Sequence, residues 1–187
     1  MTKKKNIIGI CGSASPSSAN LSILNWIANA EKANFNLELV EDLTQLPHFN
    51  TALTDENVPE QIVAFRAKIA HADGIIICTP EYIFSIPSGL KNMIEWCVST
   101  TVFIDKPVGL ITASASGLKG HAELKLIMET IQTKFIDQTT LLIQGVKGKV
   151  SKDGKIMDKQ TEEELNLFID AFEKWTQKLS FENRFKS

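Results

Sequence analysis

The sequence predicts a single α/β domain built on a parallel β-sheet. Its 187 residues are 43% apolar and 22% charged, which suits one soluble domain with a sizeable core. Apolar strand-like runs alternate with amphipathic helical patterns five times, and this alternation is typical of a parallel sheet with right-handed crossovers. No linker, repeat or low-complexity segment interrupts residues 1–187, so we expect one domain.

Five short runs are the expected strands. The third run, "GIIIC", is continuously apolar, which indicates a central strand covered on both faces. The runs in chain order are "KNIIGICGS" (5–13), "FNLELVEDL" (35–43), "GIIIC" (74–78), "KPVGLITAS" (106–114) and "TTLLIQ" (139–144).

Helical spacing of apolar residues follows each of these runs. The helix after the third run is expected over about 88–99, and the last helix is expected to begin near Thr161, where Thr161 and Glu164 form a capping-box pattern. Before it, Asp153 and Gly154 predict a tight turn. The other helices are expected within 19–33, 54–72 and 121–135.

Charge and cysteine content narrow the function classes. The formal net charge of −2 gives no reason to expect a nucleic-acid partner, since proteins that bind phosphate backbones usually carry a basic face. The basic run Lys3 to Lys5 precedes only a short apolar stretch, and no run is long enough to cross a membrane, so we expect a cytoplasmic protein with no membrane partner. Cys11, Cys78 and Cys97 lack the spacing of a zinc site or a disulfide framework, so no metal is expected.

Doubly wound sheets bind ligands at the carboxyl ends of their strands, which directs attention to three loops. The first, Gly12 to Asn20, carries four serines and an asparagine and leads into a helix. A helix N-terminus suits a phosphate, and the hydroxyls add neutral donors. Serine and asparagine also cap helices without any ligand, so the local pattern leaves both interpretations open.

The second and third loops follow the third and fourth strands. In "PEYIFSIP" (80–87), backbone around Pro80 to Phe84 could bind the polar edge of a flat ring, or the apolar side chains could form a subunit interface. In "ASASGLKG" (113–120), Gly117 and Gly120 permit close backbone approach, but taken alone this loop favours an ordinary helix-entry turn. His121, beside this loop, is the one histidine retained as a possible substrate contact.

Other catalytic motifs are missing from the sequence. It has no dinucleotide-binding GxGxxG, no GxxxxGK[ST] phosphate loop and no GxSxG nucleophile elbow. We therefore assign no side chain a catalytic acid, base or nucleophile role.

Taken together, these residues resemble the NADPH-dependent FMN reductase family, flavodoxin-like proteins that include quinone, azo-dye and chromate reductases. The first loop is similar to the family pattern G-S-x-R-x-x-S-x-N, and the second to P-E-Y-N-x-S-x-P-x-x-L-K-N-x-I-D-W. The residues that match the two patterns are Gly12, Ser13, Ser18, Asn20, Pro80, Glu81, Tyr82, Ser85, Pro87, Leu90, Lys91, Asn92, Ile94 and Trp96.

The resemblance implies a flavodoxin-like three-layer α/β/α sandwich with five parallel strands in the order 2-1-3-4-5. It implies that Ser13, Ser18 and Asn20 hold the FMN phosphate. It further implies that Pro80 to Ile83 lie along the isoalloxazine and that Ser114 to Gly117 approach its pyrimidine side. The residues expected to bind the cofactor are Ser13, Ser15, Ser18, Asn20, Pro80, Glu81, Tyr82, Ile83, Ser114 and Gly117.

Three positions depart from the family patterns: Glu95 stands for aspartate in the second, and two other replacements bear on the cofactor. Ser15 stands where the first loop of the family has arginine, and Ile83 stands where the second has asparagine. A charged hydrogen bond contributes about 1.5–3 kcal/mol, so we expect phosphate binding about ten- to a hundredfold weaker than with the arginine. Ser15 replaces part of that as a neutral donor, and Ile83 keeps its main-chain groups.

The function implied by the resemblance is an FMN-dependent NAD(P)H oxidoreductase, with NADPH or NADH as electron donor. Hydride would pass through the flavin to a small acceptor, which could be a quinone, an azo dye, free flavin or a metal oxyanion. The family commonly forms dimers or larger assemblies, so a homodimer or homotetramer is expected, with Phe84 and Ile86 facing a partner or lining the flavin cleft. Two alternatives are a non-enzymatic electron carrier and a flavin-free module that binds a small anion.

Overall fold

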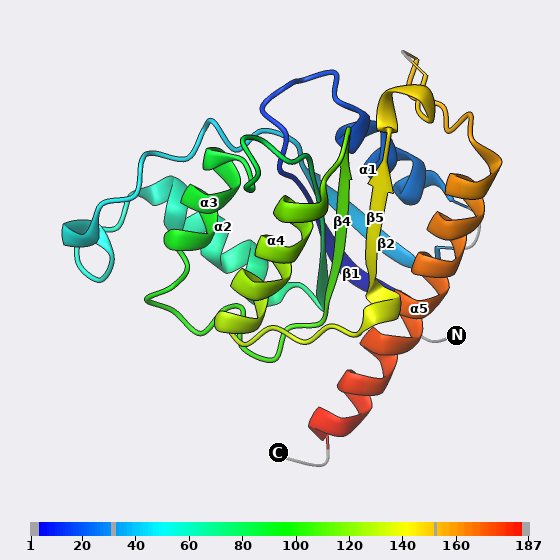
Figure 1. Cartoon of the computed structure of the whole chain (residues 1–187). Coiled ribbons are helices and arrows are strands. Elements are labelled where there is room, and N and C mark those ends of the chain that lie inside the picture. Colours follow the sequence, from blue (N-terminus) through cyan, green and yellow to red (C-terminus); the bar gives the residue numbers. More distant parts are fainter. Residues whose placement is uncertain (1–3, 31–32, 152, 185–187) are drawn as a thin grey trace.

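A computed structural model describes residues 4–30, 33–151 and 153–184. Five parallel strands form one sheet in the order β2-β1-β3-β4-β5, with helices on both sides (Figure 1). The predicted three-layer α/β/α architecture and the predicted strand order are both confirmed. The strands are β1 (Lys5–Cys11), β2 (Phe35–Val40), β3 (Gly74–Thr79), β4 (Val108–Ser114) and β5 (Thr140–Gln144).

The helices cover the sheet from two sides. α2, α3 and α4 lie over one face, and α1 and α5 lie over the other (Figure 1). The helices are α1 (Ala19–Asn29), α2 (Glu60–His71), α3 (Ser88–Glu95), α4 (Leu118–Thr130) and α5 (Lys159–Arg184), and the short 3₁₀ turns are η1 (Thr51–Leu53), η2 (Asp137–Thr139) and η3 (Val146–Gly148).

The central strand β3 is apolar on both faces of the sheet, so helices must pack against both faces. All six of its residues are buried, as the continuous apolar run predicts. Because side chains alternate along a strand, Ile75 and Ile77 enter the core beneath α2–α4, whereas Ile76 and Cys78 enter the core beneath α1 and α5. One apolar strand therefore serves two cores.

Two helix boundaries differ from the sequence predictions. α3 ends at Glu95, and the chain from Trp96 to Ser99 continues as turns that an apolar pattern does not distinguish from helix. α5 begins at Lys159, because the carboxylate of Asp158 accepts hydrogen bonds from the Thr161 N–H at 2.9 Å and the Thr161 hydroxyl at 2.6 Å. Asp158, rather than Thr161, caps this helix.

The strand register brings three loops to one edge of the sheet. Cys11 at the end of β1 pairs with Cys78 of β3, and Thr79 at the end of β3 pairs with Thr112 of β4. The chain order reverses between β1 and β3, which is where doubly wound sheets bind ligands. No helix among the described residues is both long and apolar enough to cross a membrane.

Candidate functional site

The first loop leaves β1 close to the neighbouring strand. The Gly12 N–H donates to the carbonyl of Cys78 at 2.9 Å, and a Cβ on Gly12 would lie only 2.4 Å from the Thr79 hydroxyl oxygen, so the loop starts where only glycine fits. Ser13 is buried and its hydroxyl accepts from the Ser15 N–H at 3.2 Å. The Ser15 side chain is exposed at the mouth of the loop.

Ser18 caps α1. Its hydroxyl accepts from the Leu21 N–H at 3.2 Å and lies 3.7 Å from the Cys11 sulfur, while its carbonyl accepts from the Ser22 N–H at 3.1 Å. Between Gly12 and Asn20 there is no charged side chain, so the loop itself brings no counter-charge to the positive end of the α1 dipole. Neutral donors at a helix N-terminus fit the chemistry of a phosphate.

Asn20 lies beneath the loop, where only 3% of its surface is exposed. Its carbonyl oxygen accepts from the Cys78 thiol at 3.4 Å, and its amide nitrogen donates to the carbonyl of Ala113 at 3.3 Å. Both ends of the side chain are therefore used to tie α1 to β3 and β4. In this structure, Asn20 positions the first loop against the strand that leads into the third.

The second loop is a tight hairpin. Tyr82 and Ser85 exchange two backbone hydrogen bonds, at 2.9 and 3.0 Å. The two residues between them, Ile83 and Phe84, have φ angles of 51° and 59°, the left-handed conformation that a type I′ turn requires at both positions. A β-branched residue there is a conformational outlier, and strain of this kind gathers at functional sites.

The tip of this hairpin is apolar and open to solvent. Ile83 is 96% exposed and Phe84 is 75% exposed, and the Tyr82 hydroxyl lies 3.5 Å from that of Ser13 in the first loop. The expectation that Ile86 faces a partner or a flavin cleft is wrong. Because the hairpin reverses the chain, Ile86 is only 5% exposed and packs in the core beneath α2–α4.

Glu81 joins the second loop to the third. Its carboxylate accepts from the Gly120 N–H at 2.7 Å and from the Gly117 N–H at 3.3 Å, so it caps the N-terminus of α4. A Cβ on Gly120 would lie 3.1 Å from the Glu81 side chain, which shows how closely α4 approaches this hairpin. The positive end of α4 thus already has a negative partner within the chain.

The third loop turns at Gly117, where φ is 84°. The positive φ favours glycine, and a Cβ there would also require the Leu142 Cδ1 methyl, 2.8 Å away, to move. Ser114 is half-buried at the end of β4, on the same edge of the sheet as the first two loops.

His121 follows in the first turn of α4. A ring nitrogen lies 2.9 Å from the Thr112 hydroxyl, and burial, with a smaller contribution from the charge of Lys125, lowers the pKa of the imidazole below its ordinary value. The ring therefore favours the neutral form near neutral pH. This contact with Thr112 joins α4 to β4. The possible role of His121 as a substrate contact stays a prediction.

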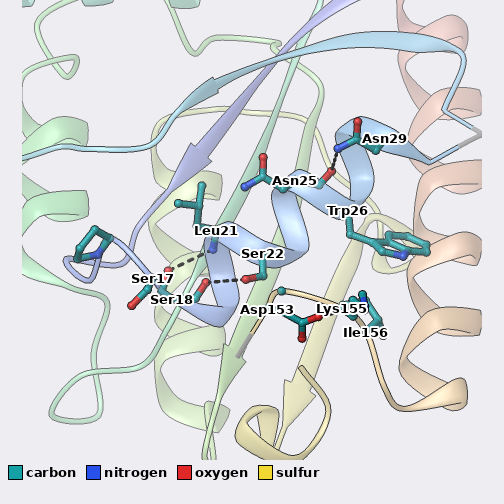
Figure 2. Close-up of a pocket in the computed structure, with 12 residues that line it drawn as sticks. Ser17, Ser18, Leu21, Ser22, Asn25, Trp26, Asn29, Asp153, Lys155 and Ile156 are labelled. Atoms are coloured by element: carbon teal, nitrogen blue, oxygen red, sulfur yellow. Dashed lines mark hydrogen bonds and ion pairs between the residues drawn. The ribbon is translucent and has the colours of Figure 1, made fainter. Parts of the chain in front are cut away.

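A separate cavity of about 700 Å³ lies along the outer side of α1 (Figure 2). It touches the first loop only at Pro16 to Ser18 and otherwise runs between Trp26 and the turn at Gly154. The predicted Asp153–Gly154 turn is present, with Gly154 at a φ of 83°. The cavity shares no residue with the second or third loop, so it is not the place where the three loops meet.

The structure thus brings the ten predicted cofactor residues to one edge of the sheet from three loops. Sequence reasoning missed the tie between these loops, in which Glu81 reaches Gly120 and Asn20 reaches Ala113. No local pattern signals these contacts, and the structure supplies the reason for one glycine: a Cβ on Gly120 would lie 3.1 Å from the Glu81 side chain. Within the described part of the chain, no cluster of three or more His, Cys, Asp or Glu side chains could hold a metal ion.

Comparison with protein families gives one match that spans most of the chain. The sequence profile of the NADPH-dependent FMN reductase family matches residues 5–147, which include all five strands and the three loops of the site.

Individual relatives support the same assignment. The chain is 30% identical to the NADH:(hydroxy)cinnamate reductase subunit CrdA of Vibrio ruber, over 94% of this chain and 89% of the relative. It is 26% identical to a quinone reductase of Escherichia coli K12, over 96% and 99% of the two chains. The solved structure of FerB, a flavoenzyme NAD(P)H:(acceptor) oxidoreductase from Paracoccus denitrificans, superposes with a TM-score of 0.79 at 27% identity, covering 93% of this chain and 98% of FerB.

Proposed function

The chain belongs to the NADPH-dependent FMN reductase family, and from its site we propose that it passes electrons from NAD(P)H through FMN to a small quinone-type acceptor. Family membership makes it an oxidoreductase that uses FMN and a reduced nicotinamide nucleotide, as the sequence resemblance implies. The expectation of an enzyme is confirmed, and the non-enzymatic and flavin-free alternatives are set aside.

The observation that carries the proposal is the contrast between two helix ends at this edge. Glu81 already neutralises the N-terminus of α4, whereas the N-terminus of α1 opens onto a loop of neutral donors. An FMN phosphate would therefore be held at the α1 end by Ser13, Ser15 and Ser18, with loop N–H groups around it. Asn20 would act beneath them by fixing the loop.

The other predicted residues would hold the ring. Main-chain groups of Pro80 to Ile83 would bind its polar edge on one side, and Ser114 and Gly117 would approach it on the other. Glu81, which spans both loops, would keep their separation constant. Bound FMN supplies the two-electron chemistry, and the protein supplies position and access. We assign no side chain a proton-transfer role.

Exposed apolar side chains next to this edge favour a flat, apolar acceptor. Tyr82, Ile83 and Phe84 offer apolar area around the proposed ring site, and no charged side chain lies among them. A quinone suits such a surface better than a metal oxyanion, which would require cationic groups. Azo dyes and free flavin are further planar candidates. The expected homo-oligomeric assembly and cytoplasmic location stay predictions.

Steady-state turnover tests the proposal. Protein reconstituted with FMN is mixed anaerobically with NADH or NADPH, and nicotinamide oxidation is followed with and without p-benzoquinone. We expect oxidation that depends on the quinone and parallel double-reciprocal lines, because donor and acceptor use one site in turn. Chromate serves as the anionic comparison and should be the poorer acceptor. Quinone-independent rates, or turnover with chromate alone, would overturn the acceptor assignment.

A further inference from the structure

Two buried thiols lie beneath the first loop. Cys11 at the end of β1 and Cys78 near the end of β3 are paired in the sheet register, and the two residues are 1% and 0% exposed. Both belong to the core beneath α1 and α5, on the side of the sheet where the first loop leads into α1. Neither thiol has a role in the proposed electron transfer, yet each contacts a polar side chain of that loop.

The contact of Cys78 is with the side-chain amide of Asn20. The thiol donates to the Asn20 oxygen at 3.4 Å, and the amide nitrogen donates to the Ala113 carbonyl at 3.3 Å. The Ala113 contact fixes which end of the amide faces the sulfur, because the opposite orientation would place two oxygen acceptors against each other. Asn20 is only 3% exposed, so the loss of either partner would leave a buried polar atom unpaired.

The Cys78 thiol is kept in the form that can donate. Burial, with a smaller contribution from the neighbouring Cys11, raises the pKa of the Cys78 thiol well above its ordinary value, so it stays protonated near neutral pH. A protonated thiol donates to an amide oxygen, whereas a thiolate can only accept. The protonated form also brings no negative charge beneath a loop proposed to bind a phosphate.

The composition of the first loop makes its geometry important. Ser15 stands where the family pattern has arginine, and the loop carries no other charge, so the proposed phosphate contacts are hydrogen bonds from neutral donors. Such bonds weaken steeply as their angle and length depart from the optimum, whereas the attraction of a point charge falls more slowly. A loop of neutral donors therefore gains most from being held in its binding geometry before the ligand arrives.

Asn20 connects the thiol to the geometry of the loop. It is the second residue of α1 and lies two residues after Ser18, whose hydroxyl accepts from the Leu21 N–H at 3.2 Å. The Asn20 side chain thus anchors the first turn of α1 to β3 and β4 at the point where Ser18 caps the helix. If the amide turned to find another donor, the first turn of α1 and the hydroxyls before it would move with it.

We propose that Cys78 is a positioning residue for the phosphate of FMN, and that it acts by donating a hydrogen bond from its thiol to Asn20. Cys78 itself does not touch the ligand. This role, which rests on the proposed function, requires the phosphate to lie at the N-terminus of α1. Its consequence is that the affinity for FMN, but not the affinity for riboflavin, depends on a hydrogen-bond donor at position 78.

Two substitutions of Cys78 separate positioning from packing. Cys78→Val keeps an apolar side chain that suits a buried strand but removes the donor, so we expect the ratio of FMN to riboflavin affinity to fall about five- to tenfold. Cys78→Ser keeps a donor but places a smaller, more polar side chain in an apolar core, so it should lower the melting temperature while the ratio stays near that of wild type. Both dissociation constants are measured on cofactor-free protein from the quenching of flavin fluorescence.

A double-mutant cycle tests whether the effect passes through Asn20. In the Asn20→Ala background, Cys78→Val should leave the ratio unchanged, because the oxygen that accepted from the thiol is gone. Cys97, which is 2% exposed in the core beneath α2–α4, is the matched control. Cys97→Val should not alter the ratio, whatever it does to the melting temperature.

The outcomes distinguish the role of Cys78 from the function on which it depends. A wild-type protein that binds riboflavin as tightly as FMN would overturn the phosphate site at α1 and the role of Cys78 with it. A wild-type ratio well above one that survives Cys78→Val would overturn only the role of Cys78. The same conclusion would follow if the ratio fell equally with Cys78→Ser, or if Cys78→Val lowered it as far in the Asn20→Ala background.

Discussion

The N-termini of α1 and α4 lie at the same edge of the sheet, but different groups accept hydrogen bonds from their first N–H groups. At α4, the Glu81 carboxylate of another loop binds the N–H groups of Gly117 and Gly120. At α1, the neutral hydroxyl of Ser18 caps the first turn, and the loop before it has no charge. The chain itself supplies the negative charge at the α4 end, whereas at the α1 end we propose that the phosphate of FMN supplies it.

The two helix ends should also differ in whether they contribute to the stability of the fold or to the binding of FMN. A helix end with a built-in carboxylate gains from that charge whether or not a ligand is present, whereas an end with a neutral cap gains a charged partner only on binding. Substitutions at Glu81 should therefore act first on the free energy of unfolding, and substitutions at Ser15 and Ser18 on the affinity for FMN.

Glu81→Ala should lower the free energy of unfolding by about 2 kcal/mol, since it removes charged hydrogen bonds from the first turn of α4. The measurement is urea unfolding of the protein without cofactor. Glu129→Ala, at an exposed position on the same helix, is the matched control and should change stability by less than about 0.5 kcal/mol. Equal effects of the two substitutions would show that Glu81 is not a structural cap.

Ser15→Arg should tighten FMN binding by about ten- to a hundredfold, because it adds a charged donor to a loop that has none. Riboflavin, which lacks the phosphate, should bind with unchanged affinity. Both dissociation constants can be obtained from the quenching of flavin fluorescence. A parallel gain for riboflavin would mean that the new side chain acts on the ring or on the fold, and the phosphate assignment at α1 would be wrong.

Ile83→Gly should raise the free energy of unfolding by about 1 kcal/mol, because glycine adopts the required positive φ without strain. Thermal unfolding measures the change. Ser85→Gly, at the base of the same hairpin, lacks a positive φ to relieve and should not stabilise the protein. A less stable Ile83→Gly protein would show that the isoleucine gains more from its surroundings than the turn costs.

His121 should give stability a pH dependence on the acid side of neutrality. Its pKa in the folded protein is lowered from about 6.5, so the unfolded chain binds the proton more readily. The contribution is fully present above pH 6.5 and is lost as the pH falls through the folded pKa. His121→Gln should flatten the unfolding free energy over this range. An unchanged slope in the variant would assign the dependence to other groups.

The fold could be predicted from the sequence almost completely. The alternation of patterns gives the five strands, and the apolar run of β3 indicates its central place, because burial on two faces requires apolar residues at every position. The three loops could also be placed at one edge of the sheet, because the carboxyl ends of parallel strands lie on the same side.

The ties between the loops could not be predicted. Glu81 and Gly120 are 39 residues apart, and Asn20 and Ala113 are 93 apart, so no local pattern indicates that they meet. The turn at Ile83 and Phe84 was hidden for a different reason: neither residue favours a positive φ, so the usual Gly or Asn signal of a type I′ turn is missing. Ile86 was misassigned in consequence, since only this turn sends it into the core.

The central claim is that the N-terminus of α1, and not that of α4, receives the phosphate of FMN. The most direct measurement is the ratio of FMN to riboflavin affinity in wild type, Ser18→Ala and Glu81→Gln. We predict that Ser18→Ala lowers this ratio, while Glu81→Gln changes both affinities together and leaves the ratio as in wild type. A ratio that falls with Glu81→Gln and not with Ser18→Ala would contradict the account.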